Sequence, residues 1–300
     1  MWFDETRILL GSELRITFEC NNEFDGDRLL LTCWKKISQF EKRYSRFLLG
    51  NVLEDINTRV GEWQTVDDET FEHLNRVRVL EEKYPFGFSL AVKGALERMG
   101  YDAHYSFVGK GIEAGDGETR DFLLRDHGEV FIFQPLEFGG FGKGYALDMV
   151  VQILDDECHN MCLDFGGDLY ARGVNQEGKK WVMVIESPFK DDEVIGTIVL
   201  DGMFLATSGT RKRRWGANNE YHHLIDPIKG TSANYWAGVS VLSSSGMEAD
   251  FLATALFCTD ADGIDMASES LSDSHFLLID SGGKIYQHDF SAVLFQNCLI

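Results

Sequence analysis

The sequence contains little proline and few positive charges. Only four of its 300 residues are proline, and 28 Lys and Arg face 49 Asp and Glu, which gives a formal net charge of −21. No stretch has the composition of a disordered linker. A strongly negative field repels nucleic acid and anionic membranes, so we expect neither as a partner. Any phosphate-bearing ligand must therefore be held locally, by backbone amides, a few cations or a metal ion.

The chain also lacks recognisable targeting and membrane-spanning signals. Its first residues, MWFDETRILLGSELRITFE, contain no basic segment followed by an apolar one, and no apolar run approaches the length of a membrane span. Cys158 and Cys162 have C-x3-C spacing, but no second close pair completes a zinc site. These features predict a cytoplasmic protein whose cysteines are mostly small buried side chains in a reducing compartment.

Helical and strand patterns are both present. The spacing of apolar residues predicts helices at 28–45, 67–84, 145–153 and 248–258. Strand patterns occur at 13–20, 129–135 and 161–174, in short segments between 179 and 244, and in a terminal hairpin at 274–290. Because the short segments follow one another too closely for crossover helices, we expect an antiparallel meander. The sequence thus predicts an α+β fold of antiparallel sheets with packed helices, in one domain spanning residues 1–300.

The stretch EFGGFGKGYALDMVVQIL, residues 137–154, has four glycines within six residues and then a helical pattern. It is not a P-loop, because Gly142-Lys143 is followed by glycine rather than Ser or Thr. It is not a Rossmann fingerprint, because Tyr145 stands where the last glycine is required. Two interpretations remain: a tight turn without a ligand, or a helix N-terminus that attracts an anion with the help of Lys143.

Asp250 and Thr254 are four residues apart in a predicted helix, so both side chains face the same way. A carboxylate and a hydroxyl are hard oxygen donors suited to Mg²⁺. The alternative is structural: Asp250 favours the helix N-terminus and Thr254 bonds back to a carbonyl of its own helix.

A third group of polar residues follows the segment ATSGT. In YHHLIDPIKG, His222 and His223 are possible bases and Asp226 is a nearby carboxylate. Asp226-Pro227 is also a turn signature, and paired histidines are common in strands. The one strong basic cluster, RKRRW at 211–215, is either a solvated turn or a local contact for an anion or a partner.

The order of these motifs resembles the ApbE family, the FAD:protein FMN transferases. GGFGKGYALD, LDFGGDLYARG, ATSGT, YHHLIDPIKG and EADFLATAL follow one another as in the family, and the resemblance runs from about Gly11 to Phe290. It implies an enzyme that binds FAD and Mg²⁺, cleaves the pyrophosphate and attaches FMN through a phosphoester to a Thr or Ser of a target flavoprotein, releasing AMP. Two alternatives stay open: an FAD pyrophosphatase that yields FMN and AMP, and a non-catalytic FAD-binding protein.

The resemblance also implies roles for individual residues. The metal ligands are the backbone carbonyl of Gly140, the Asp250 carboxylate and the Thr254 hydroxyl. His223 and Asp226 match the element where a base for the incoming hydroxyl is expected. The FAD contacts match Leu10, Phe47, Gly87, Phe88, Ser89, Glu137, Lys143 and Ile225.

Four of these positions depart from the family pattern. Leu10 stands where Met is usual, and Phe47 replaces a Tyr, which keeps an aromatic face and loses a hydroxyl. Ser89 replaces an Asp and so removes a negative charge from the nucleotide pocket, whereas Glu137 replaces an Asp and keeps the charge on a longer arm. These departures concern the FAD contacts and leave the metal ligands unchanged.

Overall fold

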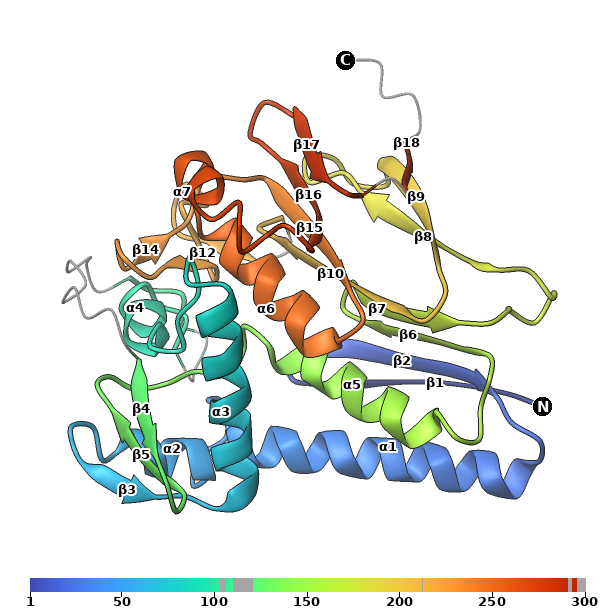
Figure 1. The fold of residues 1–300 in the computed structure, drawn as a ribbon, viewed down its shortest axis with the longest axis horizontal. Helices are drawn as coiled ribbons and strands as arrows, with labels where there is room; N and C mark the ends of the chain where they lie inside the picture. The colour runs from blue at the N-terminus through green and yellow to red at the C-terminus, as the bar shows by residue number, and fades with distance from the viewer. Residues whose placement is uncertain (103–105, 110–120, 212, 291–292, 296–300) are drawn as a thin grey trace.

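An eight-stranded antiparallel sheet organises the structure (Figure 1). The computed structural model describes residues 1–102, 106–109, 121–211, 213–290 and 293–295. In spatial order the sheet comprises β1 (Trp2–Leu9), β2 (Ser12–Glu19), β6 (Met161–Phe165), β7 (Asp168–Arg172), β10 (Met203–Gly209), β15 (Gly238–Ser243), β16 (His275–Ile279) and β17 (Ile285–His288). Every neighbouring pair in it is antiparallel, as the sequence predicts.

The central strands of this sheet are apolar on both faces. In β10, Phe204 and Ala206 belong to the larger hydrophobic core, whereas Leu205 between them belongs to a second core. Successive side chains of a strand point to opposite faces, so each face must be covered by another layer. Helices cover the first face, and the strands β8 (Trp181–Glu186), β9 (Val194–Leu200) and β18 (Val293–Phe295) form the layer that packs on the second.

Two helices, α5 (Gly142–Leu154) and α6 (Gly246–Phe257), lie side by side on the first face of the sheet (Figure 1). Each helix caps the other. The Asp250 carboxylate of α6 accepts from the Gly144 N–H of α5 at 3.0 Å, and the Asp148 carboxylate of α5 accepts from the Gly246 and Met247 N–H groups of α6 at 2.7 and 2.8 Å. First-turn N–H groups have no partner within their own helix, so this exchange satisfies donors at both N-termini.

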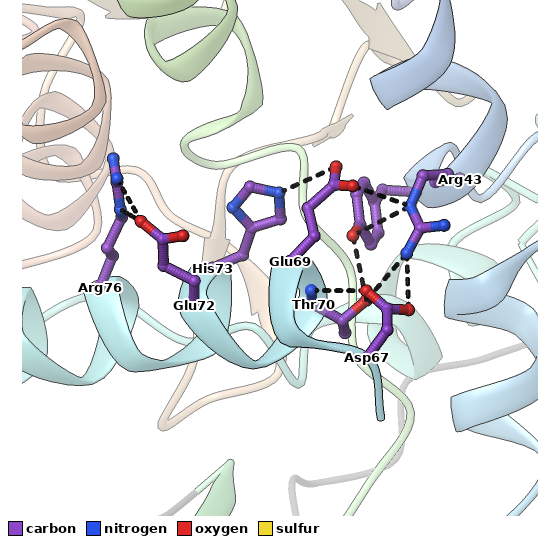
Figure 2. Close-up of polar contacts among 8 residues, drawn as sticks. Arg43, Asp67, Glu69, Thr70, Glu72, His73 and Arg76 are labelled. Carbon is purple, nitrogen blue, oxygen red and sulfur yellow. Dashed lines mark hydrogen bonds and ion pairs between the residues drawn. The ribbon is translucent and has the colours of Figure 1, made fainter. Parts of the chain in front are cut away.

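The helix α1 (Glu23–Tyr44) packs against α5, and α3 (Asp68–Lys83) holds its C-terminal end in place (Figure 2). Arg43 pairs with the α3 cap residue Asp67 at 2.6 Å, and the neighbouring Tyr44 hydroxyl lies 3.0 Å from the Thr70 hydroxyl. Tyr44 and Thr70 are almost fully buried, so these bonds form where water competes little. The contacts fix the direction in which the chain leaves α1.

The remaining elements are short. They are α2 (Val52–Asn57), α4 (Lys93–Arg98), α7 (Ala261–Met266), the small sheet of β3 (Trp63–Thr65), β4 (Phe122–Arg125) and β5 (Glu129–Ile132), and the two-stranded pairs β11 (Arg214–Trp215) with β12 (Tyr221–His222) and β13 (Ile225–Asp226) with β14 (Thr231–Ser232).

The α+β class and the four helices predicted from the sequence are confirmed, with one difference in the strands. The strand pattern of 161–174 is broken at Gly166 and Gly167, as the sequence predicts: the segment forms two paired strands that turn there, and positive φ angles of 65° and 100° favour glycine. The strands after 179 are not one continuous meander, because β8 and β9 lie in the second layer while β10 returns to the main sheet. The reason for this second layer is that the central strands of the main sheet are apolar on both faces, and the second face must also be buried.

Two further expectations concern membranes and cysteines. Among the described residues, no helix combines the length and the apolar character that a membrane span requires. Five cysteines are free thiols, of which four are buried and Cys162 is half-buried, while Cys298 lies outside the described residues. Burial raises the pKa of Cys158 and of Cys162 to about 12, so neither thiol is poised to bind a metal as a thiolate.

The α5–α6 contact predicts a specific effect of Gly144→Ala. A Cβ at Gly144 would lie 2.0 Å from the Gly246 carbonyl oxygen and 2.7 Å from Asp250 Cβ, so the two helices would have to separate. We expect the free energy of unfolding to fall by about 3 kcal/mol, as for other overpacked sites. Gly142→Ala is the matched control, because its Cβ would meet only a ring carbon of Phe40 at 3.6 Å. Urea unfolding measures both, and equal stabilities of the two variants would contradict the prediction.

Candidate active site

A cavity of about 1190 Å³ opens beside the N-terminal end of α5 and the side of α6 that carries Asp250 and Thr254. Its volume suits a large ligand such as a dinucleotide. The β1–β2 turn, the end of α1, the glycine loop before α5, β8, β10 and α6 all contribute to its wall. The structure places all but one of the predicted site residues in this wall: Leu10, Phe47, Gly87, Phe88, Ser89, Glu137, Gly140, Lys143, His223, Ile225, Asp250 and Thr254. Asp226 is the exception.

Three oxygen donors come together at the base of the cavity. The Thr254 hydroxyl lies 3.3 Å from the Gly140 carbonyl oxygen, and Asp250 projects from the same helix one turn earlier. Asp250 is only 4% exposed, and burial raises the pKa of its carboxyl to about 7, with Lys143 opposing and Asp168 adding to the shift. A carboxylate in such a place is stabilised by a cation. This donor set fits Mg²⁺, which is bound by few protein oxygens and completes its coordination with water and phosphate oxygens.

Lys143 lies beside these donors and forms a buried ion pair that the sequence analysis missed. Its ammonium contacts the Asp168 carboxylate and lies 3.7 Å from Asp250 Oδ1. Burial disfavours the charged lysine, but the two carboxylates outweigh it and raise the pKa of Lys143. Asp168 is 2% exposed and also accepts from the Thr207 N–H at 3.0 Å, which ties the ATSGT strand to the lysine. The available signal was the position of Asp168 directly after the glycine turn of LDFGGDLYARG.

The two histidines differ in their surroundings. His223 lines the cavity, and its Nδ1 atom has no hydrogen-bond partner in the part of the chain that the structure describes. Burial, together with the positive charges of Arg213, Lys143 and Arg46, lowers the pKa of His223 to about 3, so its ring is neutral. His222 is fully buried, and its Nδ1 atom accepts from the Leu224 N–H at 3.3 Å. His223 is therefore the histidine placed for chemistry.

Asp226, the other residue that the resemblance matches to the element where a base is expected, does not line the cavity. Its carboxylate accepts from the Ile228 and Lys229 N–H groups at 2.9 and 3.0 Å and from the Tyr235 hydroxyl at 2.6 Å. These bonds close the turn that the Asp-Pro signature predicts. The turn-forming interpretation fits the structure, and Asp226 affects His223 only through the backbone between them.

Two residues of the cavity wall, Gly87 and Leu10, have positive φ angles. Gly87 has φ +62°, and a Cβ there would lie 2.0 Å from the Ala255 carbonyl oxygen of α6, so only glycine fits. Leu10 has φ +49°, which is unusual for leucine, and its N–H donates to the Glu41 carboxylate at 2.7 Å. The Phe88 ring stacks on Phe251 with centroids 3.9 Å apart and so contacts α6 directly.

Ser89 and Glu137, two of the departures from the family pattern, are both engaged in hydrogen bonds. The Ser89 hydroxyl donates to Asp121 at 2.7 Å and accepts from the Ala91 N–H at 3.0 Å. Glu137 accepts from the Gly139 N–H at 2.9 Å. Both residues therefore stabilise the loops that form the wall.

The arginines of the basic cluster at 211–215 have different partners and different positions relative to the cavity. Arg211 pairs with Glu186 and Asp191 at 2.9 and 2.8 Å, as a surface turn would. Arg213 lines the cavity, and among the described residues its side chain donates only to neutral groups, the Gly11 carbonyl and the Ser12 hydroxyl, at 3.0 and 2.8 Å. Lys212 lies outside the described residues. Part of the cluster thus supplies positive charge to the cavity.

Comparison with known proteins identifies the family of this chain. The family model described as "ApbE family" matches residues 10–278. The chain belongs to the ApbE family. A relative from Klebsiella pneumoniae, an FAD:protein FMN transferase, is 26% identical over 272 residues, which cover 85% of this chain and 82% of that protein. A Haemophilus influenzae protein of the same name is 31% identical over 149 residues, 48% of this chain and 43% of its own length. The names of the relatives identify the family as one of flavin transferases. This chain, as a member of the family, is a transferase.

Solved structures of ApbE proteins share the fold. The crystal structure of the ApbE protein from Thermotoga maritima superposes with a TM-score of 0.84 at 24% identity, covering 97% of this chain and 98% of that one. The flavin transferase ApbE from Vibrio cholerae gives a TM-score of 0.80 at 19% identity, with 98% and 99% coverage. At these identities the likeness concerns the fold.

The buried His222 makes stability depend on pH. Burial lowers its pKa from 6.5 to about 4 in the folded protein, so between these values the unfolded chain binds more protons. The stability is fully present above pH 6.5 and decreases as the pH falls towards 4. In His222→Asn the amide oxygen can accept from Leu224 N–H without titrating. We expect this variant to lose about 2 kcal/mol less than the wild type between pH 7 and pH 4.5. Urea unfolding at both pH values tests this, and equal losses would contradict it.

Proposed function

We propose that this ApbE-family protein is a Mg²⁺-dependent FAD:protein FMN transferase. FAD binds in the cavity, the FMN phosphate is transferred to a Thr or Ser hydroxyl of a target flavoprotein, and AMP is released. The observation that carries the proposal is that one cavity contains the hard donor set, a half-buried lysine and a neutral histidine. The names of the relatives identify the flavin dinucleotide as the substrate to test.

The metal-binding residues in this proposal are Gly140, Asp250 and Thr254, as the resemblance implies. Bound there, Mg²⁺ supplies the positive charge that an anionic pyrophosphate requires. The protein contributes a donor set held in place by packing: Asp250 is fixed by the Gly144 N–H, and Thr254 lies close to the Gly140 carbonyl.

Lys143 is the protein's own cation at this end of the cavity. It lies at the start of α5, where the helix dipole also favours negative charge. Its pairing with Asp168 and Asp250 keeps it protonated and holds its ammonium in position. In the proposed reaction Lys143 stabilises the negative charge that develops on AMP as the leaving group.

His223 accepts the proton from the attacking hydroxyl. The hydroxyl oxygen bonds to the FMN phosphorus, the bond from that phosphorus to the bridging oxygen breaks, and AMP leaves with this oxygen. The proton passes to the neutral imidazole of His223, which lines the cavity. Arg213, Lys143 and Arg46 disfavour a charged imidazole, so an anionic substrate among them offsets that effect and makes His223 a stronger base when FAD is bound.

The metal site predicts different effects for two substitutions of Thr254. Thr254→Val removes the hydroxyl at nearly constant shape, so we expect the Mg²⁺ concentration for half-maximal FMN transfer to rise about 10-fold or more. Thr254→Ser keeps the hydroxyl and serves as the matched control, with a much smaller change. The assay incubates protein, FAD, Mg²⁺ and candidate target flavoproteins, and detects transferred flavin by in-gel fluorescence. An unchanged Mg²⁺ requirement in Thr254→Val would exclude this hydroxyl as a ligand.

Asp250→Asn tests the carboxylate without removing its bond to the Gly144 N–H. We expect transfer to fall at least about 100-fold while the melting temperature changes little. Omitting the target protein separates the open alternatives: FMN and AMP formed without it indicate a pyrophosphatase, and tight FAD binding without turnover indicates a non-catalytic protein. Undiminished transfer by Asp250→Asn would remove the proposed metal site.

The proposed base predicts a separable effect of His223→Gln. Glutamine fills a similar volume but is not a base at neutral pH, so we expect kcat for transfer to fall about 100-fold or more. The Mg²⁺ requirement and the affinity for FAD should stay within about 3-fold of the wild type, because His223 is not among the proposed metal ligands. Steady-state transfer kinetics and FAD titration measure these quantities. A loss of FAD affinity with unchanged kcat would assign His223 to binding instead.

A further inference from the structure

Arg46 places a guanidinium in the cavity wall without using all of its hydrogen-bond donors. Its side chain is only 3% exposed, and Nη1 donates to the Tyr101 carbonyl oxygen at 2.7 Å. The Nη2 atom is buried and has no hydrogen-bond partner within the described part of the chain. A buried charged donor without an acceptor is costly. A ligand atom that accepts from Nη2 would therefore stabilise this arrangement.

The position of the guanidinium is fixed before any ligand binds. Its central carbon lies 4.3 Å from the ring centroid of Phe47 and 4.3 Å from that of Tyr101. Just before it in the chain, Arg43 and Tyr44 are held by α3 (Figure 2). Such prior ordering reduces the entropy lost on binding, so the contact contributes more of its energy to affinity.

The charge around Arg46 favours a neutral polar ligand group over a phosphate. Glu137 Oε1 lies 3.6 Å from Arg46 Nε, which is close enough to balance its charge and too far for a hydrogen bond. A phosphate at Nη2 would also face the Glu137 carboxylate. Arg213, in contrast, has only neutral hydrogen-bond partners and is the better-placed arginine for an anion.

The neighbouring wall is apolar and aromatic. Phe47 packs against a small hydrophobic cluster that includes Leu96, Tyr101, Trp215 and Ile225. A planar ring fits such a surface, and its polar edge requires a specific donor. The two planar rings of FAD differ at this edge, because the flavin carries carbonyl oxygens on its pyrimidine ring and adenine carries none.

We infer that Arg46 is a binding residue for the flavin ring, donating from Nη2 to a carbonyl oxygen of the pyrimidine edge. This inference rests on the proposed function, since it takes FAD as the substrate. It assigns the end of the cavity near α4 to the FMN half of the substrate. It also gives the protein a means to orient FAD so that the flavin, and not adenine, remains on the transferred side.

The experiment compares Arg46→Met with the wild type for binding of riboflavin, which has no phosphate, and of ADP, which has no flavin. Riboflavin binding is followed by its fluorescence and ADP binding by calorimetry, both with Mg²⁺ present. We expect Arg46→Met to lower riboflavin affinity about 10-fold to 100-fold and to leave ADP affinity within about 3-fold. Arg213→Met is the matched control, because it removes a guanidinium from the same cavity, and its riboflavin affinity should be unchanged.

A second measurement does not depend on how well the variant folds. Riboflavin analogues with sulfur in place of the C2 or the C4 carbonyl oxygen are weaker acceptors, and the wild type should bind one of them about 10-fold less tightly than riboflavin. Equal affinity for riboflavin and both analogues would overturn the inference, as would a loss of ADP affinity alone in Arg46→Met or equal losses of riboflavin affinity in both arginine variants. Failure of the wild type to bind riboflavin and FAD would instead overturn the proposed function itself.

Discussion

The exchange of caps between α5 and α6 is the interaction on which the rest of the site depends. Asp148 of α5 accepts from the first N–H groups of α6, and Asp250 of α6 accepts from the Gly144 N–H of α5. This exchange requires the backbones to approach so closely that neither Gly144 nor Gly246 has room for a side chain. The same contact brings the Gly140 carbonyl from before one helix to Thr254 on the other. The donor arrangement of the proposed metal site thus follows from how two helices satisfy their N-termini.

The cavity contains positively charged side chains although the net charge of the protein is strongly negative. In the proposed function a protein of net charge −21 holds an anionic dinucleotide, and its cavity cations are kept in different electrostatic settings. Lys143 is held between two carboxylates, Arg46 is balanced by Glu137, and Arg213 has neutral partners. Each cation is therefore suited to a different part of a ligand. Electrostatic preorganisation of this kind lowers the cost of reorganisation during a reaction.

The sequence predicted the helices, the antiparallel sheets and twelve residues of the cavity wall, because each depends on a local pattern or on a motif whose residues are neighbours in the chain. It missed Asp148 and Asp168, although both stand in motifs that were recognised. Asp148 accepts from Met247, about 100 residues away, and Asp168 pairs with Lys143, 25 residues away. No periodicity in the sequence indicates contacts across such separations. It also left the role of Asp226 open, because a turn-forming aspartate and a catalytic one look alike until their hydrogen-bond partners are known.

The surroundings of Ser89 show that a substitution in the sequence does not by itself determine the charge at that site in the structure. The resemblance implied that serine at this position removes a negative charge from the pocket. In the structure the Ser89 hydroxyl donates to Asp121, whose carboxylate also accepts from the Leu90 N–H, so a carboxylate lies within hydrogen-bond distance. Burial raises the pKa of Asp121, and these hydrogen bonds oppose the shift by favouring the ionised form. A residue 32 positions further along the chain thus places a carboxylate directly beside Ser89, although Asp121 is not one of the residues that line the cavity.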